Sequence, residues 1–206
     1  MLVNNDLITD IVNAFLAQSG WEWLGASLGI LYVILAAKES IWCWPAAFAS
    51  TLIYTLLFWE GQLPMQAILN FYYMGMAVYG FILWQKSNSE SSDIVISARP
   101  LMFHAIYILA GLVTSLLIGY YLSTLYEARL PYLDALVMVF SVMTTFLMAR
   151  KILENWLYWI VIDAFAIALY WQTGFYVTIV MFLVYLVLAA YGYRNWKKLA
   201  SQSNQL

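Results

Sequence analysis

The chain alternates between long apolar stretches and short polar breaks. A membrane-spanning helix needs about 20 mostly apolar residues. Seven stretches meet this length, at 20–37, 42–59, 64–84, 101–121, 132–149, 155–171 and 174–194. Their apolar residues are continuous, whereas the strands of a membrane barrel alternate apolar and polar positions. The pattern therefore predicts an all-α membrane protein with seven transmembrane helices.

The first nineteen residues have a different pattern. Apolar residues recur there at four-residue spacing: Leu7, Ile8, Ile11, Val12, Phe15 and Leu16. This spacing is typical of an amphipathic helix that lies at a membrane interface. The segment contains no Lys or Arg, which a secretory signal needs at its start. We therefore expect residues 1–19 to form an interfacial helix.

Composition agrees with lipid as the main solvent. The chain is 65% hydrophobic and 10% charged, with a mean hydropathy of +0.79, whereas a soluble domain is nearer half apolar and a quarter charged. A net charge of −2 provides no basic surface for nucleic acid. The abundant Trp and Tyr are typical of aromatic belts at the two membrane interfaces, with a minority left for a ring-lined site.

The basic residues predict the orientation. With seven spans, eight of them fall on one side of the membrane: Lys38, Lys86, Arg99, Arg150, Lys151, Arg194, Lys197 and Lys198. Only Arg129 falls on the other side. Basic loops stay in the cytoplasm. We therefore expect the N-terminus outside and the tail, residues 195–206, in the cytoplasm.

A shift of 112 residues aligns two parts of the chain. It pairs Lys38 with Arg150, Trp44 with Trp156, Trp59 with Trp171, Tyr73 with Tyr185, and Trp84 with Trp196. Residues 20–84 and 132–194 are therefore predicted to be two three-helix repeats, with 101–121 as a linking helix. A single linking helix leaves both repeats facing the same way in the membrane. Parallel repeats of this kind occur in transporters, whose site lies between the halves.

One acidic residue lies deep in the membrane. Asp163 is at the centre of "WLYWIVIDAFAIALYW" (156–171), and an acid at that depth costs at least about 2.5–3.5 kcal/mol. Trp156 and Trp159 share its helix face, and rings beside an anion suit a flat organic cation. The alternative is a neutral carboxylic acid that bonds a neighbouring helix.

Other polar residues are predicted to share a cavity with Asp163. Gln66, Asn70 and Tyr73 lie at four- and three-residue spacing on one helix face. Ser141 and Tyr185 come from the second repeat, and Thr51 is the repeat equivalent of Asp163. This arrangement indicates amides on one side of the cavity, an acid on the other and rings between. Asn70 and Ser141 could instead bond neighbouring helices.

The linking helix carries small residues and the chain's one histidine. Gly111, Ser115 and Gly119 are spaced by four, which allows close contact with another helix. That helix could belong to the same bundle or to another subunit. We interpret His104 as a membrane-interface residue rather than a ligand.

Two segments resemble a known family. "NFYYMGMAVYGFILW" (70–84) resembles the third-helix signature of the PnuC family of bacterial vitamin transporters. "NWLYWIVIDAFAIALY" (155–170) resembles the sixth-helix signature, with its Trp and Asp. The resemblance implies a three-plus-one-plus-three architecture similar to that of the SWEET carriers, homotrimers in the bacterial inner membrane, and facilitated diffusion. Asn70 departs from the family, which usually has Gln there.

The resemblance also implies a substrate class. Members of the family carry nicotinamide riboside, and close relatives carry thiamine or riboflavin. We narrowly favour thiamine, because its aminopyrimidine can pair with a carboxyl group, and keep nicotinamide riboside as the alternative. No cofactor or metal is expected. An intramembrane enzyme would need paired acids, a metal set or a nucleophile with a base; this and a non-transporting scaffold are distant alternatives.

Overall fold

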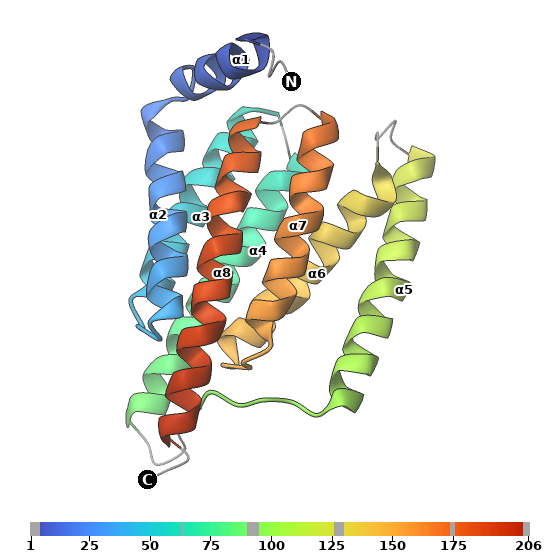
Figure 1. Cartoon of the computed structure of the whole chain (residues 1–206). Helices are drawn as coiled ribbons and strands as arrows, with labels where there is room; N and C mark the ends of the chain where they lie inside the picture. The colour runs from blue at the N-terminus through green and yellow to red at the C-terminus, as the bar shows by residue number, and fades with distance from the viewer. Residues whose placement is uncertain (1–4, 63, 90–94, 126–129, 174–175, 204–206) are drawn as a thin grey trace.

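The computed structural model describes residues 5–62, 64–89, 95–125, 130–173 and 176–203. Arg129 lies outside these ranges. Within them the regular structure is helical (Figure 1). The helices are α1 (Asn5–Leu16), α2 (Gly20–Ala37), α3 (Cys43–Glu60), α4 (Pro64–Ser89), α5 (Leu101–Leu125), α6 (Pro131–Ala149), α7 (Asn155–Thr173) and α8 (Tyr176–Ser203). The all-α prediction is confirmed, and each predicted stretch coincides with one of the helices α2 to α8.

Five of the described helices are long and apolar enough to cross a membrane: α2, α4, α5, α6 and α8. The helices α3 and α7 fall below that hydropathy. α7 contains Asp163 and several Trp and Tyr residues, and α3 ends on Trp59 and Glu60. Polar atoms on these side chains lower the mean hydropathy of a helix that is otherwise apolar. The structure supports a multi-pass membrane protein, and the count of seven spans stays a prediction.

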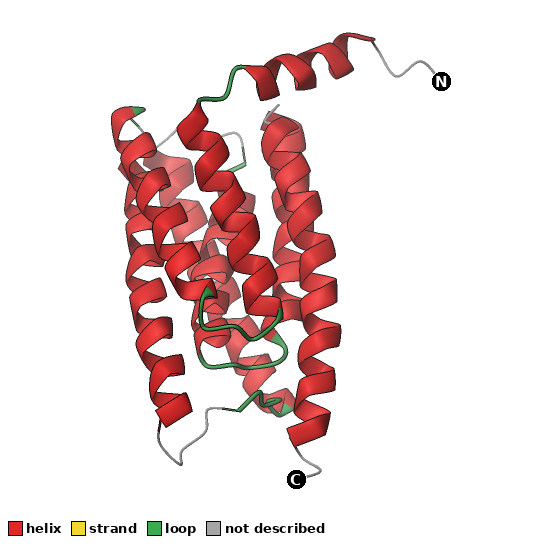
Figure 2. Ribbon diagram, turned by 90° about the vertical axis from the view of Figure 1, so that its left-hand side faces the viewer, coloured by secondary structure: helices red, strands yellow, loops and turns green. Residues whose placement is uncertain are grey.

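Six helices form a closed ring. In order around it, α2 contacts α3, α3 contacts α4, α4 contacts α6, α6 contacts α7, α7 contacts α8, and α8 contacts α2. The remaining two lie outside: α5 packs on α6, and α1 lies across one end of the bundle next to α8 (Figures 1 and 2). We call this end the α1 end. The opposite end, where α2, α4, α6 and α8 terminate with most of the basic residues, is called the basic end.

The turns that follow α2 and α6 have the same backbone structure. Glu39 (φ 57°) and Lys151 (φ 52°) both adopt the left-handed conformation, although neither is Gly. Each N–H bonds a carbonyl three residues back, Glu39 to Ala36 and Lys151 to Met148. These pairs are 112 residues apart, as are Cys43 and Asn155, which begin α3 and α7.

Four buried tryptophans make the core at the basic end. Trp44 and Trp84 pack edge to face with ring centroids 5.4 Å apart, and Trp156 and Trp196 do so at 5.5 Å. Edge-to-face packing is a favoured geometry for aromatic pairs. Each pair depends on a glycine: a Cβ on Gly192 would lie 2.7 Å from the Trp156 ring, and Gly80 lies equally tightly against Trp44.

The linking helix α5 packs against its own bundle. A Cβ on Gly111 would lie 2.5 Å from the Phe140 ring of α6, and one on Gly119 would lie 2.6 Å from Tyr132. Of the two open readings of this small-residue stripe, contact within the chain is therefore the observed one. His104, which also lies on α5, takes part in a polar network.

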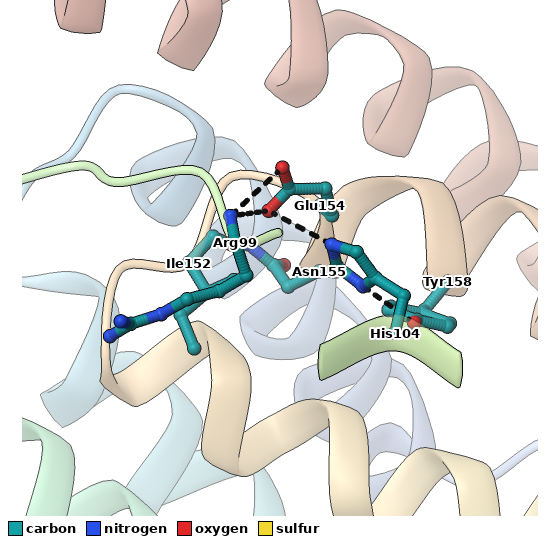
Figure 3. A network of polar contacts seen from close by, with 6 residues as sticks. All are labelled: Arg99, His104, Ile152, Glu154, Asn155 and Tyr158. Carbon is teal, nitrogen blue, oxygen red and sulfur yellow. Dashed lines mark hydrogen bonds and ion pairs between the residues drawn. The ribbon is translucent and has the colours of Figure 1, made fainter. Parts of the chain in front are cut away.

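That network fastens α5 to the start of α7 (Figure 3). The backbone N–H of Arg99 lies 3.3 Å from both carboxylate oxygens of Glu154. Nδ1 of His104 lies 2.9 Å from the Tyr158 hydroxyl, and its Nε2 lies 3.9 Å from Glu154. His104 thus has a structural position at the basic end, consistent with its interpretation as an interface residue.

Candidate functional site

A cavity of about 390 Å³ lies inside the six-helix ring. This volume is within the usual range for small-molecule sites. The nine residues predicted from the sequence all line it: Thr51, Gln66, Asn70, Tyr73, Ser141, Trp156, Trp159, Asp163 and Tyr185. Neither α1 nor α5 contributes to the lining. The structure therefore gathers in one place residues that the sequence separates by more than a hundred positions.

The second-half wall carries the acid. Asp163 is at the middle of α7 and is only 2% exposed. Among the described residues, no hydrogen bond or ion pair involving its carboxyl group is found. The predicted alternative, a bond to a neighbouring helix, is thus not observed. Trp159 lies one turn and Trp156 two turns before it on α7, and both line the same cavity, so the acid lies beside aromatic rings.

The first-half wall is polar but uncharged. Asn70 donates an amide hydrogen to the backbone oxygen of Gln66, at 3.0 Å, within its own helix. This bond leaves the side-chain oxygen of Asn70 and its second amide hydrogen for other partners. Thr51 likewise donates to the Ala47 carbonyl, at 2.8 Å, so its hydroxyl can only accept from a ligand. Gln66 is exposed and marks the part of the cavity nearest the α1 end.

Two tyrosines cross from one half toward the other. The Tyr185 hydroxyl of α8 lies against Gly29 of α2, where an added Cβ would be 2.8 Å away. Tyr73 of α4 and Ser141 of α6 lie close together in the lining of the same cavity. Tyr73 and Tyr185 are 112 residues apart, and so are Gly29 and Ser141. The two halves thus present the same tyrosine to different partners.

Sequence reasoning missed the α2 wall and part of α3. Residues found only in the structure include Gly29, Tyr32, Val33, Tyr54 and Phe58. None of them stands out in an apolar helix, because rings and small residues also face lipid. The sequence did contain a signal for two of these lining residues, because the 112-residue shift pairs Ser141 with Gly29 and Thr145 with Val33.

The chemistry of the site is that of binding. Among the described residues, no group of three or more His, Cys, Asp or Glu side chains is placed to hold a metal ion. What the cavity provides is one acid, two amides, several hydroxyl groups and a set of aromatic faces. Such a lining can hold a flat, polar or cationic molecule by stacking, countercharge and hydrogen bonds.

Comparison with known proteins gives the family. Residues 19–198 match the family model described as nicotinamide mononucleotide transporter. The chain is 25% identical over 184 residues to the riboflavin/roseoflavin transporter RibM of Streptomyces davaonensis, covering 85% of this chain and 83% of that one. It is 23% identical over 220 residues to the nicotinamide riboside transporter PnuC of Escherichia coli (strain K12), covering 94% and 92%.

A solved structure shares the fold. The crystal structure of the vitamin B3 transporter PnuC superposes with a TM-score of 0.74 at 24% identity, covering 95% of this chain and 90% of that one. The family consists of transporters rather than enzymes, and the family model spans nearly all of the ring-forming helices. The resemblance seen in the two sequence motifs is thereby confirmed, and the chain belongs to the nicotinamide mononucleotide transporter (PnuC) family.

Proposed function

We propose that the chain takes up a small aromatic B vitamin across the bacterial inner membrane by facilitated diffusion, with nicotinamide riboside as the favoured substrate. The observation that carries the proposal is Asp163, a buried acid to which the described residues offer no hydrogen bond or ion pair, in a cavity lined by rings. Nicotinamide riboside has a pyridinium ring with a fixed positive charge. Stacking on Trp159 and the charge of Asp163 suit this ring.

The other half of the cavity suits the sugar. Ribose hydroxyl groups both donate and accept hydrogen bonds, and the amides of Gln66 and Asn70 do the same. A substrate with a cationic ring at one end and hydroxyl groups at the other therefore complements both walls. Riboflavin, the substrate named for RibM, is also ringed and hydroxylated but lacks the fixed charge.

The narrow preference for thiamine is corrected. Relatives that match the chain are named for nicotinamide riboside and for riboflavin. The preference for thiamine came from the pairing of a carboxyl with an aminopyrimidine and from the Asn at position 70. Asn70, where the family usually has Gln, does not favour thiamine over nicotinamide riboside, because Asn keeps the amide group that can bond the sugar.

We also propose the three-plus-one-plus-three arrangement for the membrane. Residues 20–84 and 132–194 are the two repeats, 101–121 is the linking helix, and the repeats are related by half a turn about the membrane normal. The bounds of α2–α4 and α6–α8 agree to within two residues after a 112-residue shift, which supports this. The N-terminus lies outside with 1–19 as an interfacial helix, the tail 195–206 lies in the cytoplasm, and the assembly is the homotrimer that the family resemblance implies.

Uptake into liposomes tests the function. Purified protein is reconstituted, and entry of radiolabelled nicotinamide riboside, riboflavin and thiamine is compared with empty liposomes. We expect nicotinamide riboside to enter fastest and to equilibrate without accumulation. Imposed proton or sodium gradients should not change the end point, because Asp163 is the only carboxylate among the described residues that line the cavity and a proton relay needs several ionisable groups. Accumulation above the outside concentration would refute facilitated diffusion, and faster entry of thiamine would refute the substrate.

A further inference from the structure

The two three-helix units, α2–α4 and α6–α8, are joined tightly at the basic end. Five hydrogen bonds or ion pairs cross between them there within the described residues. They are Trp84 Nε1 to Ala149 O at 3.0 Å, Trp196 Nε1 to Ala36 O at 2.9 Å, Asn195 Nδ2 to Ala37 O at 2.8 Å, Arg150 Nε to Tyr79 Oη at 3.1 Å, and Lys151 Nζ to Glu39 Oε1 at 2.7 Å. All five involve the turns that follow α2 and α6 or the last residues of those helices.

The buried tryptophans close the ring across the same level. Trp84 of one unit lies 6.2 Å from Trp196 of the other, centroid to centroid, and each also packs on the tryptophan that begins the middle helix of its own unit. The four rings thus form a row, Trp44–Trp84–Trp196–Trp156, and each is at most 2% exposed. Trp44 and Trp156 also line the cavity. The row is therefore the floor of the cavity on the basic side.

An ion pair ties the two turns together beside this row. Lys151 is 6% exposed, and its ammonium group lies 2.7 Å from Glu39 and 4.8 Å from the centroid of the Trp84 ring. A lysine at this depth is stable only with a charge partner, and removing one partner of such a pair is strongly unfavourable. Glu39 and Lys151 are the tips of equivalent turns, so separating the turns must break this pair.

The opposite end of the cavity has a different character. Its lining there includes Gln66, which is exposed, and Phe58, which is half-buried. The structure is therefore closed toward the basic end and accessible from the α1 end. Release toward the basic end requires that the tryptophan row and the ion pair open.

We propose that the tryptophan row and the Glu39–Lys151 pair together are the inner gate of the transporter, with the ion pair as its latch. The proposal rests on the proposed transport function for its purpose. The latch itself can nevertheless be tested on the protein without any vitamin.

The only cysteine of the chain reports on this gate. Cys43 directly precedes Trp44, is completely buried, and belongs to the same core cluster as the four tryptophans. A thiol reagent can reach it only when the gate opens. The probe is N-ethylmaleimide at fixed concentration on the full-length protein in liposomes, with the labelling rate read by mass spectrometry.

We expect Glu39→Gln and Lys151→Gln each to raise the labelling rate of Cys43 by about tenfold, because the latch holds the closed state. The double variant with Glu39→Lys and Lys151→Glu should return the rate toward that of the wild type. The control is Glu154→Gln, which loses an ion pair at the same end that does not cross between the units. Its labelling rate should stay at the wild-type value.

Three outcomes would overturn the proposal that the ion pair is the latch of the gate. Unchanged labelling in both single variants would overturn the latch, and so would an equal rise in Glu154→Gln. A faster rate in the charge-swapped protein than in the single variants would overturn it too. Thermal melting of each variant separates gate opening from general unfolding, and Lys151→Arg, which keeps the charge, should label slowly even if Lys151→Gln does not fold. Failure of vitamin uptake would leave the labelling result intact.

Discussion

The gate and the cavity both contain residues that the 112-residue shift pairs, but the paired residues are alike in the tryptophan row of the gate and mostly unlike in the cavity. In the tryptophan row and its glycines, residues 112 positions apart are the same: Trp44 and Trp156, Gly80 and Gly192, Trp84 and Trp196, with nearly equal ring distances between the Trp pairs. In the cavity most equivalent residues differ: Thr51 and Asp163, Ala47 and Trp159, Asn70 and Phe182, Gly29 and Ser141. Packing is symmetric, and binding chemistry is not.

This difference has a physical basis. Two halves that move against each other need matched surfaces where they close, so that the contacts on both sides form and break together. A substrate, in contrast, has two unlike ends. A cavity lined by equal walls would offer two acids or none, and two acids at the midplane without a cation would be costly. Four experiments test this difference between the gate and the cavity.

The largest effect is expected at the gate. Trp84→Ala and Trp196→Ala should each destabilise the protein by about 3–5 kcal/mol, the usual cost of removing a buried large ring. Because the two sites have equivalent packing, the costs should agree closely. Thermal melting in detergent measures them, with Trp59→Ala as the control, since that ring is 67% exposed. A large loss of stability at one of the two sites with little loss at the other would contradict their equivalent packing.

The next effect separates the cavity walls. Asp163→Asn keeps the size of the side chain and removes its charge. A hydrogen bond to a charged group contributes about 1.5–3 kcal/mol, so the affinity for nicotinamide riboside should fall about tenfold to a hundredfold. Thr51→Val, at the equivalent position, should change it less than about threefold, because that hydroxyl already donates within α3. Titration followed by tryptophan fluorescence gives both values; equal losses would contradict an asymmetric cavity.

Trp159 tests the aromatic contribution separately from the charge. Trp159→Ala removes a stacking face and leaves Asp163 in place. Cation–π contacts contribute about 0.5–2 kcal/mol, so binding of nicotinamide riboside should weaken about threefold to thirtyfold. Trp159→Phe should recover part of this loss. Calorimetric titration of the two variants side by side provides the measurement, and full affinity in the alanine variant would show that the ring only packs.

The smallest effect concerns the tyrosines that cross the cavity. Gly29→Ala places a methyl group 2.8 Å from the Tyr185 hydroxyl, and the side chain must move to make room. We expect a loss of stability of about 1 kcal/mol, the low end for overpacking. The equivalent Ser141→Ala adds no volume and should cost less. Combining Gly29→Ala with Tyr185→Phe should restore melting, whereas simple addition of the two single effects would contradict the clash.

The sequence was sufficient for the helices and for half of the cavity. Long apolar stretches specify spans, and a polar residue inside one must face protein or water. Asp163, Asn70, Gln66 and Ser141 were therefore visible, and all of them line the cavity. Tyr32, Val33 and Gly29 were not, because an apolar residue on a membrane helix is equally suited to lipid and to a cavity.

Two other features lay beyond the hydrophobic pattern. The breaks "AKES" and "RKILEN" look like ordinary polar turns, and only the folded ring brings Glu39 to Lys151. The apolar stretches did predict α3 and α7 as helices, but their mean hydropathy is below the level of a membrane span, in α7 partly because it carries the acid of the cavity. Polar side chains that can bind a substrate also lower the mean hydropathy of the helix that carries them. Substrate choice, finally, depends on distances within the cavity that spacing along the chain does not contain.

The contact between Glu39 and Lys151 has a consequence for the proposed half-turn relation of the two units. The two residues are 112 positions apart, so under that relation their contact lies on the axis between the units. Two identical units would bring two copies of the same side chain together on such an axis. Two glutamates or two lysines at 2.7 Å would repel strongly. The attractive pair therefore depends on the two units having different residues at this position.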